Sequence, residues 1–447
     1  MTPLTSPGSP STSLRIALLV YRGNPLSGGQ GVYVRHLSRE LTDLGHRVTV
    51  FSGQPYPNLD DGVELVQIPS LDLYREPDPF RVPRPREFKS WIDVQEFALM
   101  CTAAFPEPRT YAKRVWKALR DRRDDFDIVH DNQCLGPAIV KFQDEGWPLL
   151  TTVHHPITVD RDLDLQHASG PIRRLTLRRW YSFLKMQKRV IRQLDHLVTV
   201  SGSSRRDIAA QLRVDPDRIG IVPVGMDERT FRPLPHVERV PGRLMTTTSS
   251  DVPMKGLIYL LEALAKVRTE RPVELVVIGK PKPGGPVAQT IERLGLHDAV
   301  TFHRGIDDER LVELYAEAEL AIVPSLYEGF SLPAAEAMAC GVPVLGTTGG
   351  AIPEVLGAHG ETGLLVPPGD SGALAAAIIG ALDDPALRAR VGAAGRARAL
   401  EKFTWRACAE GTAYYYQAVI AHTAGLDAPL EPGPVVLPPA LTGVAAC

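Results

Sequence analysis

Short apolar runs alternate with stretches of helical periodicity along most of the chain. The runs are continuously apolar, which is typical of parallel strands that helices cover on both faces. The first half of the chain therefore predicts an open α/β sheet. Its predicted strands are Ile16 to Val20, Val48 to Phe51, Ile128 to His130, Leu149 to Val153 and Leu197 to Val200, with a helix from Tyr33 to Leu44.

The alternation restarts after a proline-rich stretch, Phe231 to Gly242, where Pro233, Pro235 and Pro241 disfavour a continuous helix or strand. We interpret this stretch as an interdomain linker that precedes a second α/β domain. The second domain's predicted elements are strands Leu244 to Thr248, Glu274 to Ile278, Val300 to Phe302, Leu320 to Pro324 and Val342 to Leu345, with a helix from Leu257 to Val267.

Composition narrows the class of protein. With 447 residues and a formal net charge of −2, the chain is long enough for two domains and has no overall attraction to nucleic acid. Its five scattered cysteines lack the spacing of a disulfide framework or zinc site, which indicates a reducing, cytoplasmic location. The first apolar run, Leu14 to Val20, is too short to span a membrane. Residues 1–12 are rich in Pro, Ser and Thr, and the tail 426–447 is rich in Pro and Ala. Neither segment can form a packed core, and we expect both to be disordered.

A glycine-rich turn, Ser27 to Gly31, follows the first predicted strand and leads into a helix at Val32. Glycines allow the backbone to approach a ligand, and a helix start presents free N–H groups to phosphate. A simple tight turn explains the same residues. The spacing is not that of a dinucleotide-binding fingerprint.

Two carboxylates, Glu328 and Glu336, follow the predicted strand Leu320 to Pro324. One lies on the loop and the other lies about one turn into the next helix, so both can accept hydrogen bonds from the hydroxyls of one sugar. Taken alone, Glu336 is equally explained as an acid near a helix N-terminus.

The string from Glu328 to Glu336 matches the E-x7-E signature of glycosyltransferase family 4, and several other segments agree in order. The chain therefore resembles the retaining nucleotide-sugar glycosyltransferases of that family, which have the GT-B fold: two facing Rossmann-like domains with a deep interdomain cleft. The other segments are Gly28 to Tyr33, Thr199 to Ser201, Val222 to Asp227, Lys255-Gly256 and Gly349 to Glu354.

The resemblance implies a domain organisation and a reaction. Residues 13–232 would hold the acceptor, residues 233–403 the nucleotide sugar, and a C-terminal helix at 404–425 would pack back on the first domain. A hexose would pass from a UDP- or GDP-sugar to a hydroxyl of a small-molecule or lipid-linked acceptor, with retention and without a metal or cofactor. Two alternatives remain open on the same architecture: a nucleotide-sugar epimerase or isomerase, and a nucleotide-sugar binding protein with weak catalysis.

The resemblance also implies roles for residues. Glu336 would bind the donor ribose, Glu328 the donor sugar, and Lys255 would neutralise the diphosphate leaving group. The match favours His154 over His155 as the histidine near the reacting carbon, and no general base is assigned. The implied sites are catalytic His154, Lys255 and Glu328; donor-binding Gly29, Lys255, Ile306, Glu328, Gly329, Phe330, Ser331, Leu332 and Glu336; and acceptor-side Gly28, Gln30, Gly31, Tyr33, Asp131, Asn132 and Arg178.

The chain departs from the family pattern at one position. Family members carry an arginine five residues before the lysine, where this chain has Ser250. Losing one such donor costs about a hundredfold to a thousandfold in rate. Lys280, after the strand that ends near Gly279, is the substitute that we predict.

Three further segments have alternative explanations. Arg173 to Leu194 contains eight Lys or Arg and apolar residues at helical spacing, which suits either an anionic membrane surface or a solvated outer helix. Leu71 to Arg109, rich in aromatic residues and proline, is a candidate acceptor surface. Asp162-Leu163-Asp164 resembles a metal-binding D-x-D, but we place it in a loop and expect no metal there.

Overall fold

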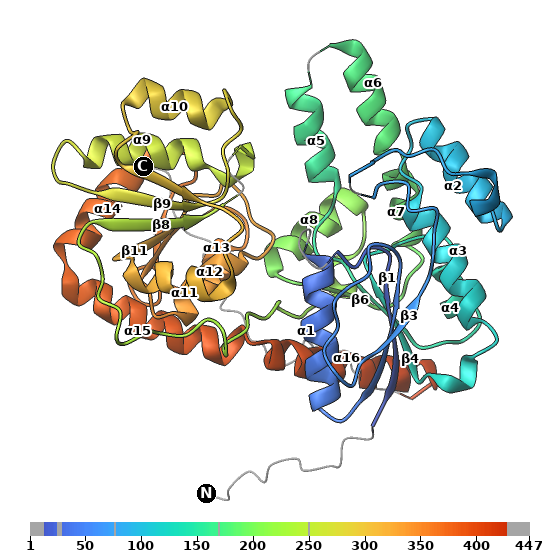
Figure 1. Cartoon of the computed structure of the whole chain (residues 1–447). Coiled ribbons are helices and arrows are strands. Elements are labelled where there is room, and N and C mark those ends of the chain that lie inside the picture. Colours follow the sequence, from blue (N-terminus) through green and yellow to red (C-terminus); the bar gives the residue numbers. More distant parts are fainter. Residues whose placement is uncertain (1–12, 25–28, 76, 169, 249–250, 427–447) are drawn as a thin grey trace, which may run out of the picture. The chain divides into compact units, whose positions relative to one another are not determined.

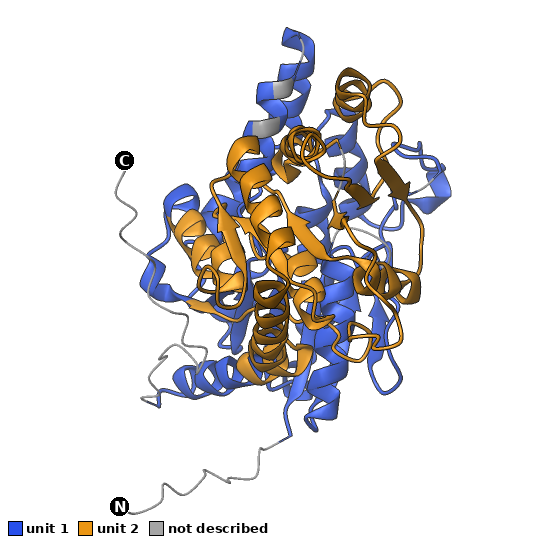
Figure 2. Ribbon diagram, turned by 90° about the vertical axis from the view of Figure 1, so that its left-hand side faces the viewer, with its two compact units in different colours: residues 1–198, 210–219, 412–431 blue, residues 199–209, 220–411, 432–447 orange. Residues whose placement is uncertain are grey.

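The computed structural model describes residues 13–24, 29–75, 77–168, 170–248 and 251–426. The predicted disorder of residues 1–12 and of the tail beyond 426 falls outside these residues. The described residues form two compact units (Figures 1 and 2). Among them, unit 1 comprises 13–198, 210–219 and 412–426, and unit 2 comprises 199–209 and 220–411. Each unit is built on one sheet.

Unit 1 contains a seven-stranded sheet in the order β3-β2-β1-β4-β5-β6-β7. The neighbouring pairs from β3 to β6 are parallel. The order reverses direction between β1 and β4, which is the position where sheets of this kind bind ligands. The strands are β1 Arg15–Val20, β2 Arg47–Ser52, β3 Glu64–Gln67, β4 Ile128–Asn132, β5 Leu149–Thr152, β6 Leu197–Thr199 and β7 Ile219–Ile221.

The helices of unit 1 precede or follow these strands and cover the sheet (Figure 1). Two helices, α8 and α16, each contribute residues to both units. Tyr416, on the part of α16 that belongs to unit 1, hydrogen-bonds the buried His130 of β4 at 2.7 Å. The helices are α1 Gln30–Asp43, α2 Trp91–Cys101, α3 Glu107–Leu119, α4 Val140–Asp144, α5 Thr158–His167, α6 Pro171–Trp180, α7 Phe183–Val190, α8 Gly202–Leu212 and α16 Trp405–Thr423.

Unit 2 contains a six-stranded parallel sheet in the order β10-β9-β8-β11-β12-β13. This is the Rossmann order, and its switch point lies between β8 and β11. The strands are β8 Arg243–Thr247, β9 Glu274–Ile278, β10 Val300–His303, β11 Leu320–Val323, β12 Val344–Thr347 and β13 Leu364–Val366; the helices are α9 Leu257–Val267, α10 Pro286–Leu294, α11 Asp308–Glu317, α12 Leu332–Ala339, α13 Ile352–Leu356, α14 Ser371–Asp383 and α15 Pro385–Lys402.

Helix α9 illustrates how the sequence produces the core of unit 2. Leu257, Leu260, Leu261 and Leu264 recur at helical spacing and are almost completely buried in one cluster with residues of the sheet. Burying such side chains stabilises each position by about 1.5–3 kcal/mol. The predicted bounds of this helix are confirmed.

Each strand predicted from an apolar run is present, with ends shifted by no more than two residues. Residues 231–242 contain no helix or strand, as their prolines predict. The sequence reading missed β3, β7 and β13, which are only three or four residues long. β3 and β7 contain only two large apolar residues each, and such runs do not stand out from the apolar residues of loops and buried helices.

Two local predictions were wrong. The basic segment Arg173 to Leu194 is not one helix: α6 ends at Trp180, α7 begins at Phe183, and Tyr181 forms the cap of α6. Asp162 and Asp164 lie inside α5 instead of a loop. The Asp164 carboxylate accepts a hydrogen bond from the Tyr181 hydroxyl at 2.7 Å, so it fastens the α5–α6 hairpin at that point.

Candidate functional site

The loops that follow β8 and β11 meet at the switch point of unit 2. Lys255 ends a short 3-10 turn after β8, and Glu328 lies on the loop between β11 and α12. The Lys255 Nζ lies 2.8 Å and 3.0 Å from the two carboxylate oxygens of Glu328. The structure therefore brings together two of the three residues predicted to be catalytic.

The polar surroundings of Glu328 hold its carboxylate in place. The Ser325 hydroxyl donates to Oε1 at 2.7 Å, and only 12% of the Glu328 side chain is exposed. Lys255 remains 31% exposed. A fixed carboxylate beside an accessible ammonium can bind a polyol and an anion that belong to one ligand.

The remaining predicted donor residues lie on or near this loop, which we call the donor loop, residues 325–331. Gly329 and the buried Phe330 follow Glu328, and the Phe330 ring packs edge-on against Phe403 at 5.4 Å. Ser331 has φ +93°, which is unusual for a residue other than glycine, and its buried hydroxyl has no hydrogen-bond partner among the described residues. Leu332 begins α12.

Other predicted positions in unit 2 lie farther from the donor loop in the sequence. Ile306 is half-buried between β10 and α11. Lys280 is exposed just after β9, the strand that pairs with β8, and its predicted role as a substitute cation stays a prediction. Ser250, where the family's arginine is expected, lies outside the described residues.

Glu336 is on α12, one turn into the helix that the donor loop begins. Burial raises the pKa of its carboxyl to about 7, and the negative charge of Asp308 adds to this shift. A group whose pKa is higher in the folded chain stabilises the fold below its unfolded pKa, and this contribution is lost as the pH rises through the folded pKa. Glu336 should therefore make the fold less stable at pH 8 than at pH 5.

We expect Glu336→Gln to remove this pH dependence. The glutamine cannot ionise, so the variant should gain roughly 1–3 kcal/mol relative to wild type between pH 5 and pH 8. Denaturant melts of both proteins at the two pH values measure the difference. Glu309→Gln, at an exposed acid on α11, serves as the control. Equal pH slopes in wild type and Glu336→Gln would contradict the expectation.

The predicted acceptor-side glycines lie where β1 leads into α1 in unit 1. Gly29 caps α1 with φ +72°, and the space beside its Cα is open. Gly31 is packed instead: a Cβ there would lie 2.1 Å from the carbonyl oxygen of Asn24. The Gln30 side chain hydrogen-bonds the Tyr21 hydroxyl. Gly28 lies outside the described residues.

His154 follows β5 and lies among other predicted residues. Its Nε2 lies 2.7 Å from Asn132 Oδ1, and its backbone N–H donates to Gln133 Oε1 at 2.7 Å. The buried Tyr33 ring packs edge-on against the imidazole at 4.6 Å. Loss of hydration lowers the pKa of His154 to about 3, so the ring is neutral at physiological pH. His155, in contrast, bonds the exposed Asp160 at 2.9 Å.

Asp131 precedes Asn132 at the end of β4 and is completely buried. Its carboxylate accepts the backbone N–H groups of Cys134 and Leu135 at 3.3 Å and 3.2 Å. Burial raises the pKa of Asp131 to about 7. These bonds shape the loop after β4, and the next residue, Asn132, orients His154.

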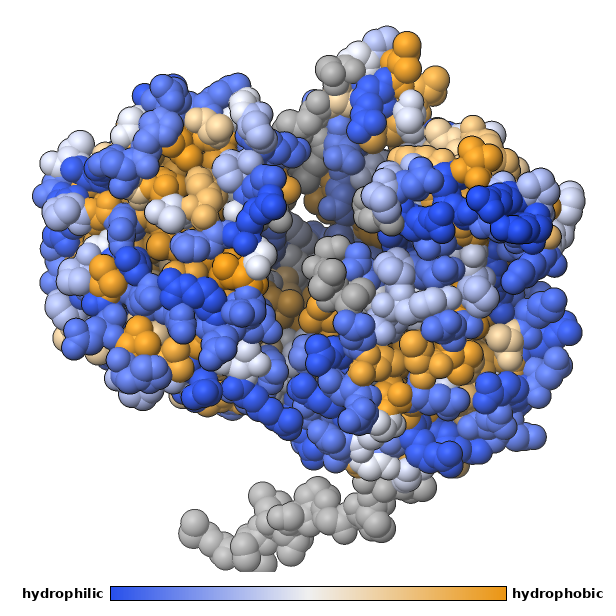
Figure 3. All heavy atoms as spheres, in the orientation of Figure 1, coloured by the Kyte–Doolittle hydropathy of each residue, from blue (hydrophilic) through white to orange (hydrophobic). Residues whose placement is uncertain are grey.

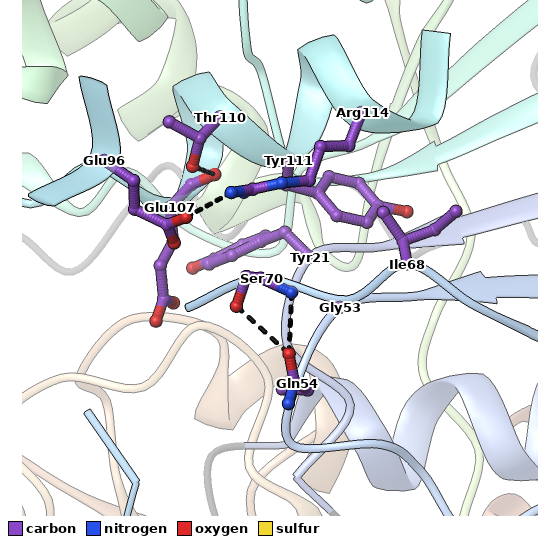
Figure 4. Close-up of a pocket in the computed structure, with 10 residues that line it drawn as sticks. All are labelled: Tyr21, Gly53, Gln54, Ile68, Ser70, Glu96, Glu107, Thr110, Tyr111 and Arg114. Carbon is purple, nitrogen blue, oxygen red and sulfur yellow. Dashed lines mark hydrogen bonds and ion pairs between the residues drawn. The ribbon is translucent and has the colours of Figure 1, made fainter. Parts of the chain in front are cut away.

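A small cavity lies at the same edge of the unit 1 sheet (Figure 4). Its volume of about 10 Å³ is enough for one water molecule and far too small for a sugar. Glu107, which lines the cavity, pairs with Arg22 at 3.2 Å, and burial raises the pKa of Glu107 to about 8. The sequence reading missed this pair because 85 residues separate its members. The lining residues are Tyr21, Gly53, Gln54, Ile68, Ser70, Glu96, Glu107, Thr110, Tyr111 and Arg114.

Arg178 is exposed on α6. This helix lies away from the strand ends of the unit 1 sheet (Figure 1). Ile172 and Leu175 on the same helix are 81% and 68% exposed. Figure 3 shows hydrophobic and hydrophilic residues side by side over the α5–α6 hairpin. No helix in the described part of the chain is long and apolar enough to cross a membrane. Within residues 13–24, 29–75, 77–168, 170–248 and 251–426, no three His, Cys, Asp or Glu side chains are grouped to hold a metal ion.

Comparisons with known proteins agree with this geometry. Residues 27–230 match the family described as Glycosyltransferase Family 4, and residues 236–398 match Glycosyl transferases group 1. The chain is 50% identical over 412 residues to the MMP alpha-(1->4)-mannosyltransferase of Mycolicibacterium hassiacum, covering 92% of this chain and 100% of that protein. It is 28% identical to the D-inositol 3-phosphate glycosyltransferase 2 of Catenulispora acidiphila, covering 91% and 95% of the two chains.

Among solved structures, the sucrose-phosphate synthase from Thermosynechococcus elongatus has a TM-score of 0.67 at 25% identity, covering 92% of this chain and 100% of that one. The chain has two Rossmann-like sheets of the GT-B class, and Lys255 pairs with Glu328 at the switch point of the second sheet. These features define the chain as a glycosyltransferase. The chain belongs to glycosyltransferase family 4. The α/β fold class, the GT-B fold and the family predicted from the sequence are confirmed.

Proposed function

We propose that this enzyme transfers mannose from a nucleotide diphosphate sugar to an acceptor hydroxyl, forming an α-(1→4) bond with retention and without a metal. The observation that carries the choice of sugar and linkage is the 50% identity with a protein named as an α-(1→4)-mannosyltransferase over that protein's whole length. The Lys255–Glu328 pair supports a donor with both a charged and a polyol part.

The proposed reaction breaks the bond between the anomeric carbon and the diphosphate oxygen. The acceptor oxygen forms its bond to the same face of that carbon, and its proton passes to the leaving diphosphate. Lys255 neutralises charge that develops on the diphosphate, and such stabilisation is worth most where water is excluded. Glu328 binds sugar hydroxyls, Glu336 binds the ribose, and neutral His154 accepts a hydrogen bond at Nδ1 near the reacting carbon.

The low pKa of His154 supports a mechanism without a dedicated base at this position. With Nε2–H donated to Asn132 Oδ1, only Nδ1 is left to accept a hydrogen bond. A histidine whose pKa is about 3 is a poor proton acceptor at pH 7. This fits the proposed transfer of the acceptor proton to the leaving group.

The acceptor belongs to the proposal only as a class: a small-molecule or lipid-linked alcohol. The end of β4 with Asn132, and the loops after β1 and β5 with Gly29 and His154, are the surface that we assign to it. The exposed α6 surface with Ile172, Leu175 and Arg178 is the candidate for contact with an anionic membrane. Sedimentation with anionic and zwitterionic vesicles tests that assignment separately.

The test is a panel of UDP- and GDP-sugars incubated with the full chain, with and without mannose-containing oligosaccharides or cell extract as acceptors. Mass spectrometry follows nucleotide release and products. Acceptor-dependent release from one mannosyl donor, unchanged by EDTA, with an α-configured (1→4) product by NMR, supports the proposal. Donor conversion without acceptor supports an isomerase. Binding without turnover under every condition supports the weakly catalytic binding protein.

A further inference from the structure

The start of α8 lies on the donor loop, and both belong to unit 2. The Ser201 hydroxyl donates to the Gly329 carbonyl oxygen at 2.7 Å, and the Ser204 hydroxyl donates to the same oxygen at 3.1 Å. Ser201 and Ser204 are 2% and 0% exposed. Two buried hydroxyls thus converge on the carbonyl next to Glu328.

The same helix start is closed by protein groups. Ser201 Oγ accepts the Ser204 backbone N–H at 2.9 Å, and the Glu354 carboxylate accepts those of Gly202 and Ser203 at 2.7 Å each. The first three amides of α8 are therefore satisfied without a ligand. This helix start serves to anchor the donor loop, since its amides are not open to a phosphate.

Neighbouring residues of the loop are held as well. The Tyr327 hydroxyl donates to the Asp207 carboxylate on α8, and the Glu328 carbonyl oxygen accepts the Ala351 N–H at 2.9 Å. The loop ends at Ser331 with φ +93°. A residue in such a conformation persists when the surrounding contacts hold it there.

We propose that Ser201 and Ser204 are positioning residues of this enzyme, which hold the Gly329 carbonyl so that the donor loop presents Glu328 beside Lys255. The assignment of a sugar donor to this loop rests on the proposed function, whereas the anchoring of the loop does not. The serines need not touch substrate, because they act through Gly329.

The first experiment measures hydrogen exchange by mass spectrometry on the ligand-free full chain. In Ser201→Ala/Ser204→Ala, amides of residues 326–331 should exchange about tenfold faster, because two hydrogen bonds that oppose local opening are lost. Ser201→Thr, which retains a hydroxyl, should exchange like wild type. Asp307→Ala is the matched control: Asp307 caps α11 in the same unit by accepting the Arg310 N–H at 2.9 Å. It should leave the donor loop unchanged.

The second experiment measures steady-state kinetics with the mannosyl donor. The double alanine variant should raise the donor KM about fivefold to tenfold, whereas Asp307→Ala should not. If the double variant does not fold, Ser204→Ala alone suffices, because it retains the capping bond of Ser201. The proposal is overturned if the double variant leaves the exchange rates at 326–331 or the donor KM unchanged. It is also overturned if Asp307→Ala raises these exchange rates or the donor KM equally. If the double variant exchanges faster than wild type at 326–331 but wild type transfers no sugar, the proposed function is refuted and the anchoring is not.

Discussion

Lys255→Ala is expected to lower kcat/KM for the mannosyl donor by about 100- to 1,000-fold. The variant loses the ammonium that we assign to the diphosphate leaving group, and removing one preorganised donor of this kind costs that much in other enzymes. It also removes the ion-pair partner of Glu328 at 2.8 Å, so that, among the described side chains, Ser325 alone holds the carboxylate. Initial rates of nucleotide release, with acceptor present, measure the effect.

Two matched variants separate charge from position. Lys255→Arg retains the charge with a different shape and should recover part of the lost rate. Lys266→Ala removes an ammonium on α9 that bonds the Ser371 hydroxyl at 3.1 Å, and its rate should equal that of wild type. A rate for Lys255→Ala within threefold of wild type would refute the role assigned to this lysine.

Gly350→Ala is expected to damage both the fold and the reaction. Gly350 has φ +63°, and a Cβ there would lie 2.3 Å from the Glu328 carbonyl oxygen. The methyl group must therefore displace the backbone of the donor loop or of its own loop. Strained backbone and overpacking together should lower the free energy of unfolding by roughly 2–4 kcal/mol. Displacement of Glu328 should lower kcat/KM by about a hundredfold.

Gly360→Ala isolates the cost of the backbone conformation in the same unit. Gly360 has φ +79°, but nothing lies within 4 Å of the position of a Cβ. It should lose only about 1 kcal/mol, the usual cost of a left-handed non-glycine residue, and retain full activity. Denaturant melts and donor kinetics of both variants make the comparison. Equal losses in the two variants would show that contact with Glu328 is unimportant.

Much of the architecture and the main motifs followed from local patterns. A strand that is buried on both faces has no polar alternation, so runs such as Ile16 to Val20 indicate parallel sheets by their composition alone. The spacing of Glu328 and Glu336 determined that one acid would lie on the loop and the other on α12. The resemblance added the identity of the family, which the comparisons confirm.

Only the tertiary structure decided which loops meet. Lys255 and Glu328 are 73 residues apart, and they pair because β8 and β11 are neighbours in the sheet. Strand order depends on packing over the whole sheet, and no local periodicity encodes it. The same reason explains why the hydrogen bonds from Ser201 to Gly329 and from His154 to Asn132 could not be predicted from spacing. The sequence by itself determined the strands of the two sheets and the positions of Glu328 and Glu336. The tertiary structure decided the order of the strands and the residues that these side chains contact.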